Sequence, residues 1–259
     1  MIQIIAKIGQ LILNPISKLG MFTRFTKNGI KSIFIPPVSF SLLLIQIEFI
    51  GNRSIVIILM SGVMVGGIFG FQLGEIFQIF GAESMIGAAA GFALSRELAP
   101  IIGAFLVTGR AGSAMAAELA TMKVNEQIDA MQVMSVNPMH YLVAPRVLAS
   151  ILTLPILIVI FIFSGVLSAF IIGIIFYNID IADFFAKIRW IISIKDIFMG
   201  MQKAAVFGIV FSMVGCYQGF MTRGGAKGVG SATTRAVVIS YVAILVLDYL
   251  MTYLQFMFE

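Results

Sequence analysis

The chain has 259 residues, of which 17 are Lys or Arg and 12 are Asp or Glu, and hydrophobic residues make up 60% of it. A soluble protein of this length would carry roughly 65 charged residues. The composition therefore excludes a soluble globular enzyme and a disordered chain, and the single cysteine excludes a disulfide scaffold and a cysteine-based metal cluster. We expect an all-α integral membrane protein in which residues 1–259 form one domain, because such apolar runs cross a membrane as helices.

The N-terminal residues have the pattern of a helix that lies on a membrane surface. Apolar residues recur at helical spacing from Ile4 to Leu19, and polar residues fill the opposite face. A secretory signal peptide is the alternative, but no small-residue cleavage site follows a compact apolar region. Residues 32–47 are short for a span and carry Pro36 and Pro37, so we expect them to be interfacial or re-entrant. The N-terminal region would then comprise residues 1–50.

Five longer apolar runs follow within residues 51–259, each of about the 20 residues that a bilayer core requires. They are residues 54–74, 84–109, 147–177, 197–222 and 236–258. The third run exceeds that length, so it should tilt, kink near Pro155 or project beyond the lipid. The sequence therefore predicts an interfacial helix followed by a bundle of five transmembrane helices.

Four glycines are spaced by four along the first span: Gly62, Gly66, Gly70 and Gly74. They make a groove down one face of a helix, which lets another backbone approach closely and favours helix association in lipid. The alternative is that glycine is simply common in membrane helices. We expect tight packing here, and the partner remains open between a helix of the same chain and a second copy.

The distribution of basic residues predicts the orientation. Twelve Lys and Arg residues lie in the N-terminal region and in the loops after the second and fourth spans, whereas the loop after the third span holds three. Because basic residues concentrate on the cytoplasmic side, the N-terminus should be cytoplasmic and the C-terminus outside.

Four charged residues lie inside the predicted spans: Arg96, Glu97, Lys203 and Asp248. Each is costly if it stands alone in lipid, and their charges sum to zero. We therefore expect them to pair with one another, or to line a wet cavity, between the second, fourth and fifth spans. A purely structural ion cluster is the alternative to a functional cavity.

The loop after the second span is helical in pattern from residue 118 to residue 134. Asn125 is suited to cap a helix whose first turn carries Glu126 and Asp129, and Pro138 ends the pattern. The methionines of this loop offer an adaptable surface. A short amphipathic helix between two long spans favours a docking surface for a cytoplasmic partner, and a surface helix with no partner is the alternative.

Several familiar chemistries are missing from the chain. The glycine-rich residues 224–231 lack the phosphate-loop pattern, so we expect a flexible cytoplasmic turn, able to meet anionic lipid through Arg223 and Lys227. The single histidine, His140, cannot build a metal site or a catalytic triad, and we expect Cys216 to serve packing. We expect no catalytic residue, no metal and no cofactor, so any ATP hydrolysis takes place on another chain.

The central and C-terminal sequence resembles the MlaE/YrbE family, the permease subunits of ABC transporters that work with MCE proteins. The resemblance extends over roughly residues 45–255. The runs that carry it are RELAP at residues 96–100, GRAGSA at 109–114, AELATMKV at 117–124, EQIDAM at 126–131, GGAKGVG at 224–230 and ATTRAVV at 232–238.

The resemblance implies a permease that works as a homodimer and moves phospholipid or another hydrophobic lipid between the inner membrane and the outer envelope. It implies three further partners besides the second copy: a cytoplasmic ABC ATPase that binds the ATP, an MCE-domain substrate-binding protein and the lipid, with no nucleic acid. The family's coupling helix, which docks the ATPase, would correspond to Glu118, Lys123, Glu126, Gln127, Asp129, Met131 and Met134. The residues beside the lipid cavity would be Arg96, Glu97, Lys203, Arg235 and Asp248.

The location implied is a bacterial inner membrane, with a plastid envelope membrane as the alternative. Two other function classes are alternatives to a permease. A stand-alone channel or secondary transporter predicts inverted repeats, and none is visible. A membrane-embedded lipid-modifying enzyme needs a cluster of catalytic residues near an interface, and the sequence offers none beyond the intramembrane charges.

Overall fold

The computed structural model describes residues 2–34 and 40–258, and this part of the chain is all-α. The long helices are joined by short turns, by two 3-10 helices and by three π-helical segments. The α-helices are α1 (Ile2–Ile33), α2 (Phe40–Ile50), α3 (Ile55–Ile79), α4 (Ile86–Ala93), α5 (Ala99–Val107), α6 (Ser113–Val124), α7 (Gln127–Val133), α8 (Ala144–Tyr177), α9 (Ile181–Ile191), α10 (Ile194–Phe220) and α11 (Gly225–Met257). The 3-10 helices are η1 (Asn52–Ser54) and η2 (Glu83–Met85), and the π segments are η3 (Leu94–Leu98), η4 (Thr108–Gly112) and η5 (Met139–Val143).

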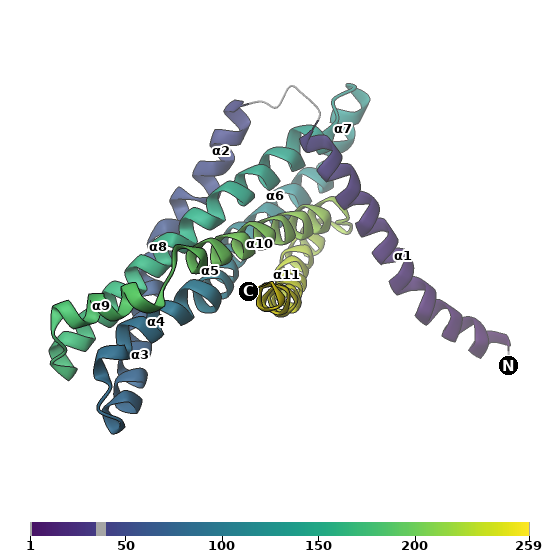
Figure 1. Cartoon of the computed structure of the whole chain (residues 1–259). Helices are drawn as coiled ribbons and strands as arrows, with labels where there is room; N and C mark the ends of the chain where they lie inside the picture. The colour runs from purple at the N-terminus through teal and green to yellow at the C-terminus, as the bar shows by residue number, and fades with distance from the viewer. Residues whose placement is uncertain (1, 35–39, 259) are drawn as a thin grey trace.

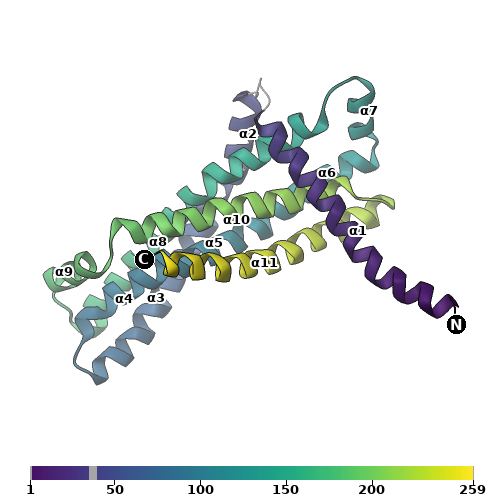
Figure 2. The ribbon, with the colours of Figure 1, turned by 45° about the vertical axis from the view of Figure 1, so that its right-hand side comes forward.

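The described residues contain five helical segments that are long and apolar enough to cross a membrane, as the sequence predicted. They are Phe40–Ile79, Glu83–Val124, Met139–Tyr177, Ile194–Phe220 and Gly225–Met257. Figure 1 shows α8 near the centre and α11 nearly end-on, and Figure 2 shows α10 and α11 running along one another.

The first segment begins earlier than predicted. The described part of residues 32–47 does not fold back as a re-entrant segment would, because α2 continues through η1 into α3 and both helices pack along α8. Ile50 is fully buried in that contact, so apolar packing on α8 fixes the helix direction. Residues 35–39, with the two prolines, lie outside the described residues.

The second segment ends later than predicted, and the fifth begins earlier. One helical run continues from α4 to Val124, so Arg110, Glu118 and Lys123 lie on the spanning segment itself and not in a loop. The glycine-rich stretch is not a flexible turn, because α11 already begins at Gly225. Gly224 (φ +89°) and Gly225 (φ +65°) supply the left-handed backbone that turns the chain between α10 and α11.

The four glycines of α3 contact α8 of the same chain. All four are buried, and a Cβ atom at Gly66 would overlap the backbone of Gly165, while one at Gly62 would overlap Ser164. The predicted tight packing is therefore present, and its partner is an internal helix, not a second copy. Backbones in such close contact gain dispersion energy that bulkier side chains would prevent.

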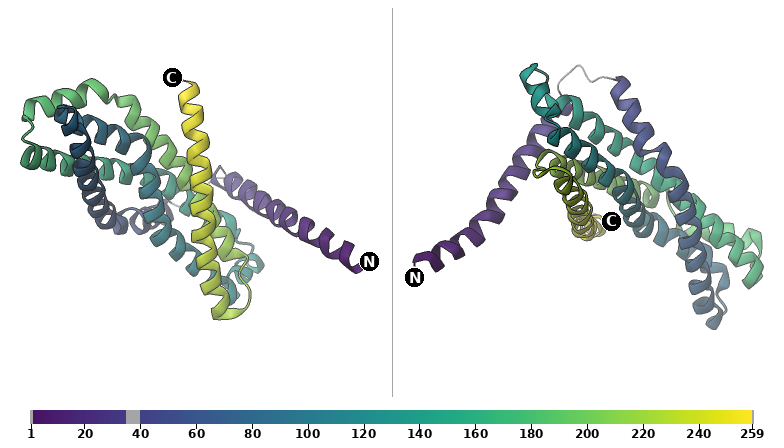
Figure 3. Two further views of the ribbon diagram at one scale, coloured as in Figure 1. Left: turned by 90° about the horizontal axis from the view of Figure 1, so that it is seen from below. Right: turned by 180° about the vertical axis from the view of Figure 1, so that it is seen from behind.

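The N-terminal helix α1 projects away from the bundle, and only its C-terminal part is tied to it (Figures 1 and 3). Phe25 is buried with its ring 5.4 Å from the rings of both Tyr217 and Phe220. Ser32 Oγ donates to the carbonyl of Met139 at 3.3 Å, which holds the end of α1 against η5. The helix is present as predicted, and which face of residues 4–12 meets a membrane remains an expectation.

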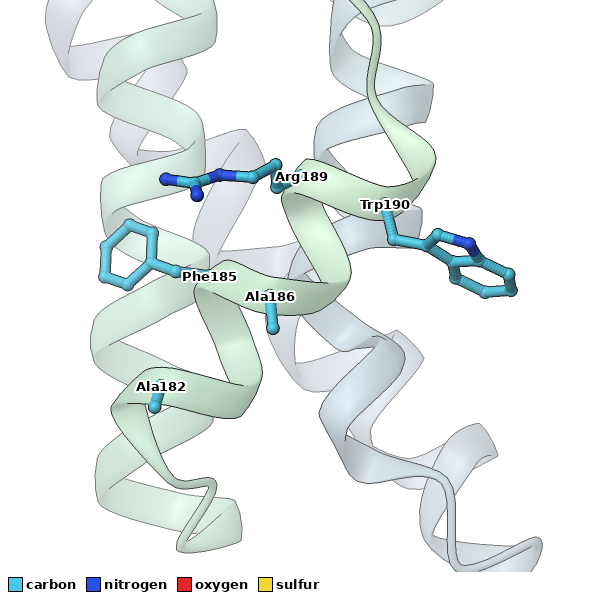
Figure 4. A pocket seen from close by; sticks show the side chains of 5 residues that line it. All are labelled: Ala182, Phe185, Ala186, Arg189 and Trp190. Atoms are coloured by element: carbon cyan, nitrogen blue, oxygen red, sulfur yellow. The ribbon is translucent and has the colours of Figure 1, made fainter.

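A second amphipathic helix, α9, lies between the third and fourth spans and was not predicted. Asp180 caps its N-terminus by accepting from the Ala182 N–H at 2.8 Å, and Phe184 is fully buried against the small face of α4 at Gly87. Figure 4 shows the opposite side, where Phe185, Arg189 and Trp190 line a shallow hollow. The Trp190 indole is exposed, and tryptophans are enriched at membrane–water interfaces.

Candidate functional site

Lys203 is the centre of an ion cluster that joins three spanning segments. This lysine of α10 is fully buried, and its Nζ lies 2.7 Å from Glu97 Oε2 of η3 and 3.1 Å from Asp248 Oδ1 of α11. Nζ also donates to Thr252 Oγ1 at 2.7 Å. The Thr252 hydroxyl lies 3.1 Å from Glu97 Oε1 and 2.9 Å from the Asp248 carbonyl, so it can donate to either acceptor.

Solvent exposure increases across the cluster from Lys203 to Asp248 and then to Glu97. The Lys203 side chain has no exposed surface, Asp248 is 12% exposed and Glu97 is 37% exposed. A buried ammonium is tolerated in a membrane only when carboxylates and hydrogen bonds compensate it. With one lysine and two ionised carboxylates the cluster carries a formal charge of −1, and the partly exposed Glu97 presents that charge at the surface of the bundle.

Arg96 does not join this cluster, so the predicted neutral group of four charges is wrong. Its Nε lies 2.6 Å from Asp196 Oδ1, and its guanidinium stands 4.6 Å from the centre of the Phe92 ring. Arg96 and Glu97 are adjacent on a helical segment and so point to different sides of it. The predicted group of four is replaced by the contact between Arg96 and Asp196 and by the cluster of Lys203, Glu97 and Asp248.

Asp196 is the buried charged partner of Arg96 that sequence reasoning missed. It was placed just outside the fourth span, whereas it is buried in the first turn of α10. Its Oδ2 accepts from the Ser193 N–H at 2.7 Å and from the Ser193 hydroxyl at 2.9 Å, which completes a capping box. The spacing of Ser193 and Asp196 is the sequence signal that would have revealed the helix start.

Arg235 lies apart from the cluster. It is exposed on α11, and its Nε and Nη2 bond to the carbonyl and hydroxyl of Ser231 one turn earlier on the same helix. At 1.5 Å of rise per residue, Arg235 stands roughly 20 Å from Asp248 along α11. The structure therefore separates this residue from the other four predicted cavity residues.

The predicted coupling helix is divided into two helices. Asn125 is the C-cap residue of α6 and not the predicted N-cap of the next helix, and Glu126 adopts the left-handed conformation (φ 59°) that starts α7 in a new direction. Lys123 Nζ holds Asp129 at 2.7 Å across this corner. Glu118 Oε2 forms an ion pair with Nη2 of the buried Arg146 of α8 at 2.8 Å, so its carboxylate secures the base of the loop.

Fewer of the predicted docking residues are exposed at this loop than the sequence suggested. Glu126, Gln127 and Met134 are exposed, whereas Met131 packs inward with the buried Ile128. The most exposed hydrophobic side chain of α7 is that of Val133, which is 87% exposed and was not among the predicted docking residues. Among the described residues no group of His, Cys, Asp and Glu is placed to hold a metal ion.

Comparison with known proteins agrees with this architecture. The family profile described as Permease MlaE matches residues 43–254. A probable ABC transporter permease of Rickettsia typhi is 38% identical over 249 residues, which cover 96% of each chain. A probable ABC transporter permease of Synechocystis is 39% identical over 82% of this chain and 80% of its own.

A plastid protein is similar as well. The chloroplast protein TRIGALACTOSYLDIACYLGLYCEROL 1 of Arabidopsis thaliana is 39% identical over 207 residues, which cover 80% of this chain and 59% of the plastid protein. The relatives are named permeases, which is the non-catalytic role expected from the sequence. With its five long apolar helices, this chain belongs to the MlaE family of ABC transporter permeases.

Proposed function

We propose that this permease moves phospholipid or a similar lipid between the inner membrane and the outer envelope, driven by an ATPase on a separate chain. The observation that carries the proposal is the buried Lys203 cluster, because charges inside spanning segments mark transport pathways more often than they serve stability alone. The name of the plastid relative is that of a galactolipid, which favours a lipid cargo. The full assembly would contain two permease copies and an MCE-domain protein.

The structure offers a continuous mechanical link for ATP-driven movement. The segment from η2 to α6 connects Glu97 at the cluster with Lys123 at the base of α7, and two π segments interrupt it. π segments are local irregularities that recur at functional sites. In this proposal the ATPase pushes on the exposed face of α7, and the displacement reaches the cluster along the one helical segment.

The proposed orientation places α7 and the turn between α10 and α11 in the cytoplasm, and α9 on the outer side. Figure 2 shows these two groups at opposite ends of the bundle. The basic residues of the chain concentrate at the α7 end. The glycine groove does not form the interface between permease copies, because α8 already covers it.

Reconstitution with the ATPase subunit tests the proposal. The chain should copurify with an ATPase, and the pair should move a fluorescent phospholipid between vesicles only when ATP is hydrolysed. Asp248→Asn should reduce that movement at least tenfold while copurification persists, and Asp183→Asn, an exposed change on α9, should leave it unchanged. Lipid movement without ATP would point to a stand-alone channel and would overturn the proposal.

Charge reversal at α7 tests the docking assignment separately. Glu126→Lys changes the side chain of an exposed residue whose backbone starts α7, so the fold should persist while lipid movement per ATP falls. The matched control is Glu75→Lys, an exposed acid at the far end of α3. Equal coupling in both variants would count against α7 as the docking site.

A further inference from the structure

Two arginines from separate spanning segments meet at one end of a lipid-facing groove. Arg53 of η1 and Arg110 of η4 stand 5.9 Å and 5.3 Å from the centre of the same Phe49 ring. Arg110 Nη1 is held by the Phe49 carbonyl at 2.9 Å and by Ser54 Oγ at 2.7 Å, so its position is fixed. Arg53 is exposed beside it.

In the part of the chain that the structure describes, neither the Arg53 nor the Arg110 guanidinium has a carboxylate partner. Glu48, the nearest acidic residue in sequence, lines a different hollow, between α2 and α8. Two like charges held against one ring therefore create a local excess of positive charge that attracts an anion.

Within the first spanning segment, Phe40–Ile79, the longest uncharged run begins just after Arg53 and ends at Gly74. Arg53 directly precedes the 21 uncharged residues 54–74. At 1.5 Å per residue this run is about 30 Å long, which equals the thickness of the hydrocarbon core. When α3 crosses the membrane, Arg53 and its neighbour Arg110 accordingly lie where phosphate groups lie.

An apolar groove leads away from the arginines between α3 and α5. Its walls are mostly side chains of α3, with one residue of α5. Among them the flexible side chains of Met60 and Met64 are 56% and 62% exposed. The lining residues are Arg53, Val56, Ile57, Met60, Ser61, Met64, Val65, Ile102 and Arg110. Methionines adapt to irregular apolar ligands such as acyl chains.

We propose that this groove binds an anionic phospholipid of the surrounding leaflet, with its phosphate on Arg53 and Arg110 and one acyl chain along Met60 and Met64. Guanidiniums match phosphate oxygens in geometry and charge. A second copy of this chain is the less suitable occupant, because a symmetric contact at this groove would bring further arginines to the same place without an acid. The site lies about 20 Å along the segment from Glu97 and is separate from the Lys203 cluster.

Photo-crosslinking in nanodiscs tests this binding. The chain is placed in nanodiscs that contain equal amounts of mass-distinguishable diazirine phosphatidylglycerol and phosphatidylcholine, and adducts are mapped on α3 and α5. Wild type should favour phosphatidylglycerol there, and Arg53→Gln should lower that ratio about fivefold, as expected for one basic residue near an anionic surface. The exposed Lys27→Gln on α1 should leave the ratio unchanged.

A second pair of variants tests the groove itself. Met60→Trp fills it and should remove adducts of both lipids from α3, whereas Leu59→Trp, exposed on α3 outside the groove, should not. An unchanged lipid ratio in Arg53→Gln, unchanged adducts in Met60→Trp, or crosslinks only between two copies of α3 would overturn the proposal. The measurement needs neither ATP nor the ATPase, so its failure leaves the proposed transport function standing.

Discussion

The bundle holds its helices together in two different ways. Along α3 and α8 glycines allow a close approach, because Gly62, Gly66 and Gly70 lie against backbone atoms of α8, and Gly74 lies against the ring of Tyr177. Around Lys203 the contact between η3, α10 and α11 is made by long charged side chains with paired atoms about 3 Å apart. Both solve the same problem, since lipid tails supply no hydrophobic force between helices.

The two contacts differ in how much displacement of the helices they allow. Close backbone packing tolerates almost no displacement, because dispersion energy falls steeply with distance. An ion cluster with an exposed edge has alternatives, since Glu97 can exchange Lys203 for water or for a polar ligand group. We infer that α3 and α8 form the fixed part of the permease and that the helices around Lys203 form the part whose arrangement can change.

Removing the lysine should have the largest effect. Lys203→Met leaves Glu97 and Asp248 facing each other without a cation, and breaking a buried ion pair costs about 3–5 kcal/mol. Thermal unfolding of the detergent-purified protein should show the loss. The triple variant Lys203→Met, Glu97→Gln, Asp248→Asn should recover most of it, and a triple variant as unstable as the single one would contradict the cluster.

Adding one methyl group to the glycine contact should come next. Gly66→Ala forces α3 away from Gly165, at about 1–3 kcal/mol for overpacking. Gly230→Ala on α11 is the control, because no atom lies within 4 Å of the added Cβ, and it should be neutral or slightly stabilising. Equal unfolding temperatures for the two variants would show that α3 and α8 are not in close contact.

The two contacts also differ in how far the sequence predicted them. The four-residue spacing identified the glycine face of α3, but periodicity along one helix names no partner, so α8 could come only from the fold. The cost of a charge in lipid predicted that the four charges pair or line a wet cavity, but it did not say which of them pair. The structure brings Lys203 together with Glu97 and Asp248. The pairing of Arg96 was not predicted, because its partner, Asp196, lies just outside the predicted span of residues 197–222.

The helix ends were predicted less well than the spans, for a physical reason. Charged residues were used to end helices, yet Arg110, Glu118 and Lys123 continue one segment because each has a bonded partner. The helix α9 is too short and too polar to register as a span. Its burial through Phe184 against Gly87 is a tertiary contact that local pattern does not reveal.

The second ion pair should be the next most sensitive point. Asp196→Asn removes the charge that holds Arg96 and weakens the cap of α10, so we expect a loss of about 2 kcal/mol. Asp180→Asn at the start of α9 is a matched control, because Asn caps a helix as well as Asp and none of the ion pairs among the described residues involves Asp180. The same unfolding assay applies, and a loss as large for Asp180→Asn would remove the special role of the Arg96 pair.

The hydroxyl groups of the two contacts should show the smallest difference. Thr252→Val removes an oxygen that receives a hydrogen bond from the buried Lys203, and we expect a loss of about 1 kcal/mol. Ser164 lies against Gly62, but its hydroxyl bonds only within its own helix, to the Phe161 carbonyl at 3.0 Å. Ser164→Ala should therefore be nearly neutral in the unfolding assay. If Ser164→Ala proves the more harmful, polar bonding sustains the contact between α3 and α8, and the distinction between a packed contact and an ionic one fails.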